Sequence, residues 1–386
     1  MIEGGMEILI SAGETSGDRY GAELASKISE HLEGDVVFFG VGGQAMARAG
    51  VRLIADLTGH SVVASLGFTR HLVSIYSAYR RLVQMIRHER PRLAVLVDTP
   101  TFNLPLARRL KRFGVPVIYF VSPQVWAWGK GRLKKIQRYV SRMIVIFPFE
   151  QRFYQRAGVP VEYFGHPLVK RVRSKLTRDE FFRKYDMDPS VPLISLLPGS
   201  RREEVSFILP TLVDAAGALG ESYQYVVSSA PNIGQDPIRR VIESRRQRQG
   251  RRLRMAILEE DLYDALCYSE AAAVCSGTAT LEAALLGTPF VMVYRIAAWR
   301  WSLRKFFVQV PYYCIVNLIA GQQVVKELMQ DDFAPESTAE EIRRLIGQKE
   351  ASERMKIEFR RIREILDRGD AIESAARFIV QSLGSQ

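Results

Sequence analysis

A group of hydroxyl, glycine and acidic residues follows an apolar segment in the second half of the chain. Residues 271–274 read Ala-Ala-Ala-Val, then come Ser276, Gly277 and Thr278, with Glu282 a few positions further on. This order predicts a strand, a tight turn and a helix with Glu282 in its first turn. The free N–H groups at such a helix start favour phosphate. A carboxylate there can accept hydrogen bonds from the two hydroxyls of a ribose, so the pattern suits a diphosphate joined to a sugar. The alternative is that Glu282 only complements the helix dipole.

A second turn of this kind follows the apolar residues 191–197. It reads Pro198-Gly199-Ser200-Arg201, and Arg202-Glu203-Glu204 comes next. We interpret it as another strand, glycine turn and helix start, here with an arginine in the position that would meet an anion.

Asp98 is the strongest catalytic candidate among the acids of the first half. It comes directly after the apolar residues 93–97, which predict a buried strand. An acid at the carboxyl end of a parallel strand points into the crevice where α/β sheets bind ligands. The alternative is an N-cap for a helix that begins near Leu104.

Two tryptophans, Trp126 and Trp128, follow another predicted strand at residues 117–121. Large aromatic side chains in such a loop favour either a local packing cluster or one wall of a binding site.

Length and charge limit the possible classes of protein. A chain of 386 residues predicts two domains, and 47% apolar residues are typical of a globular protein. The net charge is +12, and residues 60–160 alone hold eighteen Lys or Arg against three acids. Such a basic region indicates an anionic partner, whereas solvated helix faces are the alternative.

The remaining composition argues against several other classes. Three cysteines without metal-ligand spacing predict neither a disulfide framework nor a metal site. The amino terminus has acids before a short apolar run, so we expect a first strand and not a signal peptide. No apolar segment reaches the ~18 residues of a membrane span.

Strand and helix patterns alternate along both halves, which predicts an α/β fold. Residues 71–86 form the clearest amphipathic helix, and we expect its apolar stripe to pack into the core. A strand at residues 143–147 is expected to close the first sheet. Nothing around Asp56 indicates a strand, which weakens a dinucleotide interpretation of Gly40-Val-Gly-Gly43, and Glu327 is expected in a helix.

Taken together, the motifs resemble those of the lipid-A-disaccharide synthases, inverting glycosyltransferases of the GT-B fold. The matching stretches occur in family order over nearly the whole chain. They are residues 12–18 (AGETSGD), 97–103 (VDTPTFN), 122–129 (SPQVWAWG), 164–167 (FGHP), 197–204 (LPGSRREE), 276–282 (SGTATLE) and 317–321 (NLIAG). The chain differs from the usual family pattern at Arg70, Thr101 and Val316.

The resemblance implies two Rossmann-like domains whose parallel sheets face each other across a cleft. We place the acceptor and membrane-facing domain at residues 1–165, a hinge at 166–190, the UDP-sugar domain at 191–345 and C-terminal helices at 346–386. The implied reaction moves 2,3-diacylglucosamine from UDP to the 6-hydroxyl of 2,3-diacylglucosamine 1-phosphate, and it needs no metal or cofactor. The expected location is cytoplasmic, on the inner face of the inner membrane, with an anionic membrane surface as partner and a homodimer possible.

The matching motifs also suggest site residues. Asp98 would be the general base, and Arg201 the second catalytic residue. The expected donor contacts are Gly199, Ser200, Arg201, Ser276, Gly277, Thr278, Glu282 and Asn317. The expected acceptor contacts are Glu14, Ser16, Gly17, Asp18, Asn103, Gln124 and Trp126. Because Thr101 stands where the family usually has a second acid, we expect no acidic neighbour beside Asp98.

Three other functions remain as alternatives. One is another GT-B enzyme that uses a UDP-sugar, such as an N-acetylglucosaminyltransferase or an epimerase. Another is a protein that binds a nucleotide sugar or an anionic lipid without catalysis. Nucleic-acid binding is the weakest, because no RNA- or DNA-binding module accompanies the basic residues.

Overall fold

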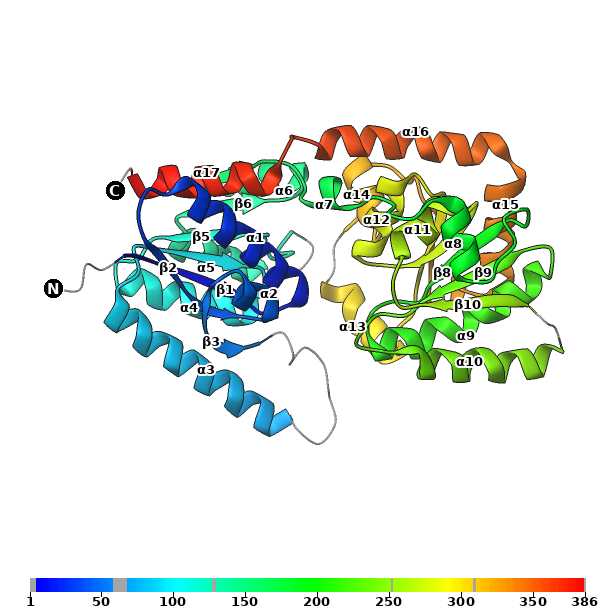
Figure 1. Ribbon diagram of the computed structural model, residues 1–386, viewed down its shortest axis with the longest axis horizontal. Helices are drawn as coiled ribbons and strands as arrows, with labels where there is room; N and C mark the ends of the chain where they lie inside the picture. Colours follow the sequence, from blue (N-terminus) through cyan, green and yellow to red (C-terminus); the bar gives the residue numbers. More distant parts are fainter. Residues whose placement is uncertain (1–4, 58–67, 127–129, 251–252, 308–309, 385–386) are drawn as a thin grey trace. The chain divides into compact units, whose positions relative to one another are not determined.

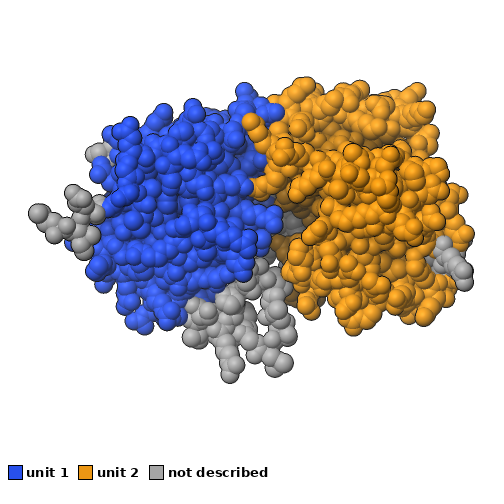
Figure 2. Space-filling view, viewed as in Figure 1, with its two compact units in different colours: residues 1–167, 366–386 blue, residues 168–365 orange. Residues whose placement is uncertain are grey.

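The computed structural model describes residues 5–57, 68–126, 130–250, 253–307 and 310–384. The chain folds into two compact units, which Figure 2 colours separately. Unit 1 contains residues 1–167 together with 366–386, and unit 2 contains residues 168–365.

Unit 1 is built on a seven-stranded sheet in the order β3-β2-β1-β4-β5-β6-β7, and every described pairing is parallel (Figure 1). Its strands are β1 Met6–Ala12, β2 Val36–Gly42, β3 Arg52–Asp56, β4 Leu93–Val97, β5 Val117–Phe120, β6 Arg142–Val145 and β7 Val161–Tyr163. Its helices are α1 Thr15–His31, α2 Gln44–Arg48, α3 Phe68–Glu89, α4 Pro100–Arg112, α5 Lys130–Tyr139, α6 Pro148–Arg156 and α17 Ala371–Gly384.

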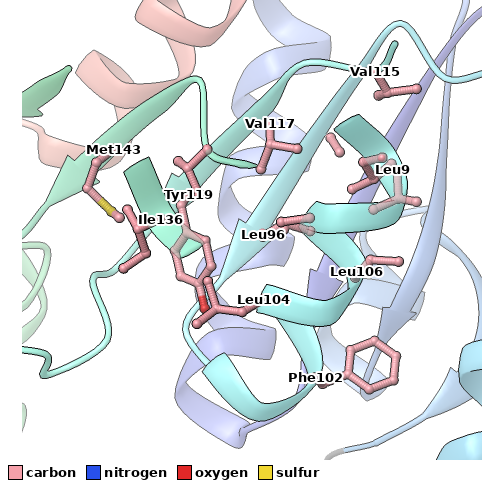
Figure 3. Close-up of a cluster of buried hydrophobic side chains, with 14 of the residues drawn as sticks. Leu9, Leu96, Phe102, Leu104, Leu106, Val115, Val117, Tyr119, Ile136 and Met143 are labelled. Atoms are coloured by element: carbon pink, nitrogen blue, oxygen red, sulfur yellow. The ribbon is translucent and has the colours of Figure 1, made fainter. Parts of the chain in front are cut away.

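Helices cover both faces of this sheet, which explains why its central strands are continuous apolar runs. On β1, Leu9 packs with the α3, α4 and α5 side, whereas Ile8 and Ile10 pack with the α1 and α17 side. Figure 3 shows the first of these clusters, with Leu9, Leu96 and Tyr119 packed against side chains of α4 and α5. As expected, the apolar stripe of α3 contributes to this core through residues such as Leu82 and Ile86.

Unit 2 repeats the design with a six-stranded parallel sheet in the order β10-β9-β8-β11-β12-β13. Its strands are β8 Leu193–Leu197, β9 Gln224–Ser228, β10 Arg254–Leu258, β11 Ala271–Cys275, β12 Phe290–Tyr294 and β13 Glu327–Met329. The helices of its first half are α7 Leu168–Arg171, α8 Arg178–Lys184, α9 Arg202–Leu219, α10 Gln235–Gln249 and α11 Leu262–Tyr268. Those of its second half are α12 Thr278–Leu286, α13 Ala298–Phe307, α14 Ile315–Ala320, α15 Pro335–Gly347 and α16 Lys349–Leu366, with a 3-10 turn at Gln330–Asp332.

Each sheet has one point at which the strand order reverses direction. In unit 1, β1 and β4 lie side by side there, with Ala12 paired to Val97. In unit 2, β8 and β11 lie side by side at the corresponding point, with Leu197 paired to Val274. Open α/β sheets bind ligands beyond the carboxyl ends of strands at such points. The loops that follow these four strands, together with the first part of the helix after each loop, contain most of the candidate residues.

The structure corrects several expectations about secondary structure. Asp56 ends a strand, β3, which was not predicted. The sheet of unit 1 ends with β7 and not with the strand near residue 143, and Glu327 begins β13 and is not in a helix.

The carboxyl-terminal helices do not form one separate part. The helix α16 belongs to unit 2, whereas α17 returns to unit 1 and packs on α1. Ile372 and Ile379 of α17 are buried in the core of unit 1. Among the residues that the structure describes, no helix has the length and apolar character needed to cross a membrane.

Candidate functional site

Asp98 lies directly after β4, where the backbone turns sharply. Its φ angle is +46° and that of Thr99 is +43°, so two successive residues without glycine's freedom adopt the left-handed conformation. Strain of this kind persists where surrounding contacts fix the backbone, and it is common at functional sites. The helix α4 follows at Pro100, so the turn ends the strand and starts the helix within two residues.

The environment of Asp98 favours a proton-accepting role near neutral pH. Burial raises the pKa of its carboxyl to about 6, with a further contribution from the negative charge of Glu14. The acid is half-buried and still ionised at pH 7. Glu14 precedes α1 and is exposed. Asp98 therefore has an acidic neighbour after all, supplied by the loop after β1 and not by its own motif.

Asn103 holds the strained turn from within the core. It is fully buried, and its side-chain amide donates to the carbonyl oxygens of Asp98 at 2.8 Å and Val97 at 3.0 Å. Its Oδ1 accepts from the hydroxyl of Ser11 at 2.6 Å, which joins the turn to β1. The hydroxyl of Tyr119 also donates to the Asp98 carbonyl. The predicted acceptor role of Asn103 has no exposed surface to act through, whereas its contacts position Asp98.

The loop between β1 and α1 lies beside this turn. The N–H of Gly13 donates to Thr99 Oγ1 at 3.2 Å, and a Cβ atom at Gly13 would come within 2.6 Å of the Thr99 methyl group. Ser16 is exposed, and Gly17 is buried against β4. Gly13 has no space for a side chain, because the loop after β1 and the loop after β4 approach each other so closely at this position.

Asp18 has contacts that belong to the fold. Its carboxylate accepts from the backbone N–H groups of Gly43 at 2.7 Å, Ala45 at 2.9 Å and Met46 at 3.1 Å. The side chain is buried and fixes the start of α2. These bonds give Asp18 a structural role, and contact with an acceptor stays a prediction.

Trp126 and Gln124 occupy the loop after β5. Gln124 is exposed, whereas Trp126 is half-buried and packs edge-on against Phe149. The indole N–H of Trp126 donates to Glu150 Oε1 at 3.0 Å. Burial raises the pKa of Glu150 to about 8, although the donors around it lower the pKa in part. Residues 127–129, including Trp128, lie outside the described residues.

In unit 2, the turn after β8 is filled by an acid of its own helix. The N–H groups of Ser200 and Arg201 donate to Glu204 Oε2 at 3.1 and 3.2 Å, and Arg201 forms an ion pair with Glu204 Oε1 at 2.8 Å. Gly199 has a φ angle of +110°, and a Cβ atom there would lie 2.6 Å from the Glu204 carboxylate. The backbone donors predicted to meet an anion therefore already have a carboxylate partner, while most of the Arg201 side chain is exposed.

The turn before α12 has a more open arrangement. Ser276 is half-buried, and its hydroxyl donates to the carbonyl of Tyr313 at 3.3 Å. Gly277 and Thr278 are exposed. Because α12 begins at Thr278, Glu282 lies one turn inside the helix and not in its first turn. Its Oε1 accepts from the hydroxyl of Tyr263 at 2.9 Å, and the side chain is half-buried.

Asn317, like Asn103, has no exposed surface for a ligand. It is fully buried in α14, and its Oδ1 accepts from the N–H groups of Val324 and Val325 at 2.9 and 2.8 Å. Its amide donates to the Val325 carbonyl and to Glu327. All of these partners belong to unit 2, so the predicted donor contact of Asn317 stays untested while its structural contacts are extensive.

Comparison with known proteins identifies the family. A model of the family described as lipid-A-disaccharide synthetase matches residues 8–380. The lipid-A-disaccharide synthase of Koribacter versatilis is 40% identical over 98% of both chains, and that of Geobacter metallireducens is 37% identical over 98% of both. The chain belongs to the lipid-A-disaccharide synthase family. It is accordingly a glycosyltransferase of lipid A biosynthesis.

Solved structures agree with the GT-B fold class. The UDP-GlcNAc 2-epimerase of Neisseria meningitidis, bound to UDP-GlcNAc, superposes with a TM-score of 0.65 at 12% identity, covering 99% of this chain and 100% of that one. The calicheamicin glycosyltransferase CalG4 gives a TM-score of 0.61 at 14% identity, covering 98% of each chain. At such identities the likeness concerns the fold alone.

Three carboxylates that contact the candidate segments were absent from the sequence-based site. Glu150, Glu204 and Glu327 each accept hydrogen bonds from a segment that carries a predicted site residue. Glu204 and Glu150 each had a local signal, because an acid three residues after the residue that precedes a helix is a typical capping pattern. The contact of Glu150 with Trp126 and the contacts of Glu327 depend on the tertiary fold. In the described part of the chain, no group of three or more His, Cys, Asp or Glu residues could hold a metal ion.

Proposed function

We propose that unit 1 binds and activates the acceptor, 2,3-diacylglucosamine 1-phosphate, and that unit 2 binds the UDP-linked 2,3-diacylglucosamine donor. The acceptor 6-hydroxyl attacks the anomeric carbon of the donor sugar. The C–O bond to the diphosphate breaks, UDP leaves, and the new β-1,6 bond forms with inversion. The hydroxyl proton passes to a base on the enzyme.

The observation that carries this proposal is the state of Asp98. A general base works best when its pKa lies just below the working pH, and burial together with Glu14 places the Asp98 pKa at about 6. Its backbone is fixed by Asn103, so the carboxylate needs little reorganisation to meet a hydroxyl. Glu14 is exposed and its charge acts on Asp98, and Ser16 is exposed two residues further along, so we assign the acceptor contacts to these two side chains first.

The donor assignment rests on the turn before α12. The exposed backbone at Gly277 and Thr278 can receive a phosphate, and Glu282 lies within the same helix for the ribose hydroxyls. Because Glu204 already satisfies the backbone of the other turn, we assign the contribution of that turn to the Arg201 guanidinium. An arginine there would stabilise the charge that develops on the departing diphosphate.

An anionic membrane surface is the proposed partner of unit 1. The helices α4 and α5 are in contact and lie on the same side of the sheet. Their exposed bases are Arg108, Arg109, Lys111, Arg112, Lys134, Lys135 and Arg138. A cluster of this size suits the negative leaflet from which a phosphorylated lipid acceptor would come.

The direct test is incubation of the enzyme with UDP-2,3-diacylglucosamine and 2,3-diacylglucosamine 1-phosphate, followed by mass analysis of the products. The proposal predicts a disaccharide 1-phosphate and one UDP per disaccharide. Reactions without acceptor should release little UDP. An epimerised donor, transfer from an unacylated UDP-sugar, or tight donor binding without any turnover would contradict it.

A further inference from the structure

Glu327 begins β13 in unit 2, and its carboxylate is surrounded by N–H donors from one neighbouring segment. Its oxygens accept from the backbone N–H of Tyr313 at 3.0 and 3.1 Å and from that of Cys314 at 2.9 Å. The side-chain amide of Asn317 donates to it at 2.9 Å. Hydrogen bonds to a charged acceptor are among the strongest in proteins, so Glu327 fixes the segment from Tyr313 to Asn317.

This segment is held firmly by a second set of bonds. The Asn317 side chain bridges from α14 to the backbone of Val324 and Val325, just before β13. The strand β13 itself pairs with β12, with Glu327 opposite Met292. The carboxylate is therefore anchored to the sheet on one side and to α14 on the other.

The same segment contacts the proposed donor turn. The Ser276 hydroxyl donates to the carbonyl of Tyr313, whose own N–H is bound by Glu327. The Ser276 N–H donates to the Val293 carbonyl at 3.0 Å on β12, which is the strand beside β13. Glu327, Tyr313 and Ser276 thus form a continuous series of contacts that ends at the first residue of the turn.

We propose that Glu327 is a positioning residue for the donor turn. It fixes Tyr313, and through Tyr313 it fixes Ser276 and the exposed backbone of Gly277 and Thr278. The inference rests on the proposed donor role of this turn. Glu327 does not need to touch the donor, and its effect on catalysis follows from the geometry of the phosphate-binding backbone.

Glu327→Gln tests this role with little change in side-chain shape. The substitution removes the charge and turns an NH₂ group toward backbone donors, so at least one N–H loses its partner. We expect the dissociation constant for UDP and the KM for the donor to rise about tenfold or more, with the KM for the acceptor unchanged. Glu327→Asp keeps the charge and should lose less affinity.

Glu341→Gln is the matched control. Glu341 is also a carboxylate of unit 2, 2% exposed, and it pairs with Arg344 and Lys326. Both Gln variants should lose thermal stability, and only Glu327→Gln should lose UDP affinity. If Glu327→Gln does not fold, the Asp variant carries the test: weaker UDP binding at a near-normal melting temperature supports the proposal, and wild-type affinity overturns it.

Glu282→Ala separates this inference from the donor assignment beneath it. If Glu282→Ala weakens UDP binding while Glu327→Gln leaves it unchanged, the positioning role is wrong and the donor site stands. If neither variant changes UDP affinity, the donor assignment itself fails. Equal losses of UDP affinity in Glu327→Gln and Glu341→Gln would reduce the effect to general destabilisation.

Discussion

The side-chain amide of Asn103 donates to the backbone carbonyl of Asp98 at 2.8 Å, across a turn in which Asp98 has a φ angle of +46°. A buried polar group thus fixes the backbone of an acid whose pKa is raised into the range useful for catalysis. The strain, the fixed backbone and the raised pKa coincide at the point where the strand order of unit 1 reverses. The predictions below follow from this arrangement and from its counterpart in unit 2.

The charge of Glu14 should contribute to the pH dependence of turnover, beside the larger effect of burial on Asp98. A base must be deprotonated to act, so kcat should fall as pH drops through the Asp98 pKa of about 6. Glu14→Gln removes the negative charge that raises this pKa, and the midpoint of the acidic limb should move to lower pH. The pH profile of kcat measures the shift. Glu23→Gln, the same change further along α1, should leave the midpoint in place; an unmoved midpoint in Glu14→Gln would show that Glu14 does not influence the base.

Glu282→Ala should weaken UDP binding and leave the fold intact. Hydrogen bonds to a charged acceptor contribute roughly 1.5–3 kcal/mol, which corresponds to about a tenfold to hundredfold loss of affinity. Tyr263→Phe removes the hydroxyl that orients the Glu282 carboxylate and should cause a smaller loss. Titration calorimetry with UDP measures both. Unchanged affinity in Glu282→Ala would leave that residue with a role in the helix alone.

Glu150 should make unit 1 less stable as pH rises. Its pKa is about 8 in the folded protein and 4.5 ordinarily, so between these values the folded state keeps a proton that the unfolded state has lost. The stabilisation is complete below pH 4.5 and is lost as pH approaches 8, at up to about 1.4 kcal/mol per pH unit. Denaturant unfolding of wild type and Glu150→Gln between pH 5 and 8 tests this. The difference in the free energy of unfolding should change with pH, and a constant difference would place the Glu150 pKa outside this window.

Unit 1 should bind anionic liposomes through the bases of α4 and α5. Exposed charges are screened beyond ~8 Å at physiological ionic strength, so binding should weaken as salt is added. Substituting Lys134 and Lys135 with Glu reverses two charges and should strongly reduce the amount of protein that sediments with the liposomes. The same reversal at Arg239 and Arg240, which are exposed on α10 of unit 2, is the charge-matched control. If the protein does not bind anionic liposomes at low salt, the membrane proposal is wrong and the basic side chains act only on the substrates.

Much of the architecture could be predicted from the sequence because the central strands are buried on both faces. Runs such as residues 93–97 and 271–275 are wholly apolar, and each is followed by a glycine- or acid-containing turn. Short edge strands lack this signal: β7 and β13 have three residues each, and β3 carries an exposed Arg52 and Asp56. The return of α17 to unit 1 depends on tertiary packing, which local periodicity does not encode.

Part of the candidate site could be predicted from the sequence, again because apolar strands precede it. Asp98 and Ser276 follow strongly patterned strands, so their positions could be inferred. The contacts of Glu150, Glu327 and Asn317 join segments that fold together from different elements, and residue type alone does not distinguish a buried positioning group from one that touches a ligand. Glu14 was expected as an acceptor contact, and its electrostatic effect on Asp98 depends on the pairing of β1 with β4, which the sequence pattern does not encode.

Asp98→Asn tests the central claim most directly. The amide has nearly the same shape and cannot accept the hydroxyl proton, so kcat should fall at least ~10²-fold at pH 7.5. UDP affinity by calorimetry should stay close to wild type, and Asp35→Asn, an exposed acid of unit 1, should keep normal turnover. A near-normal kcat in Asp98→Asn would contradict the account and exclude Asp98 as the base.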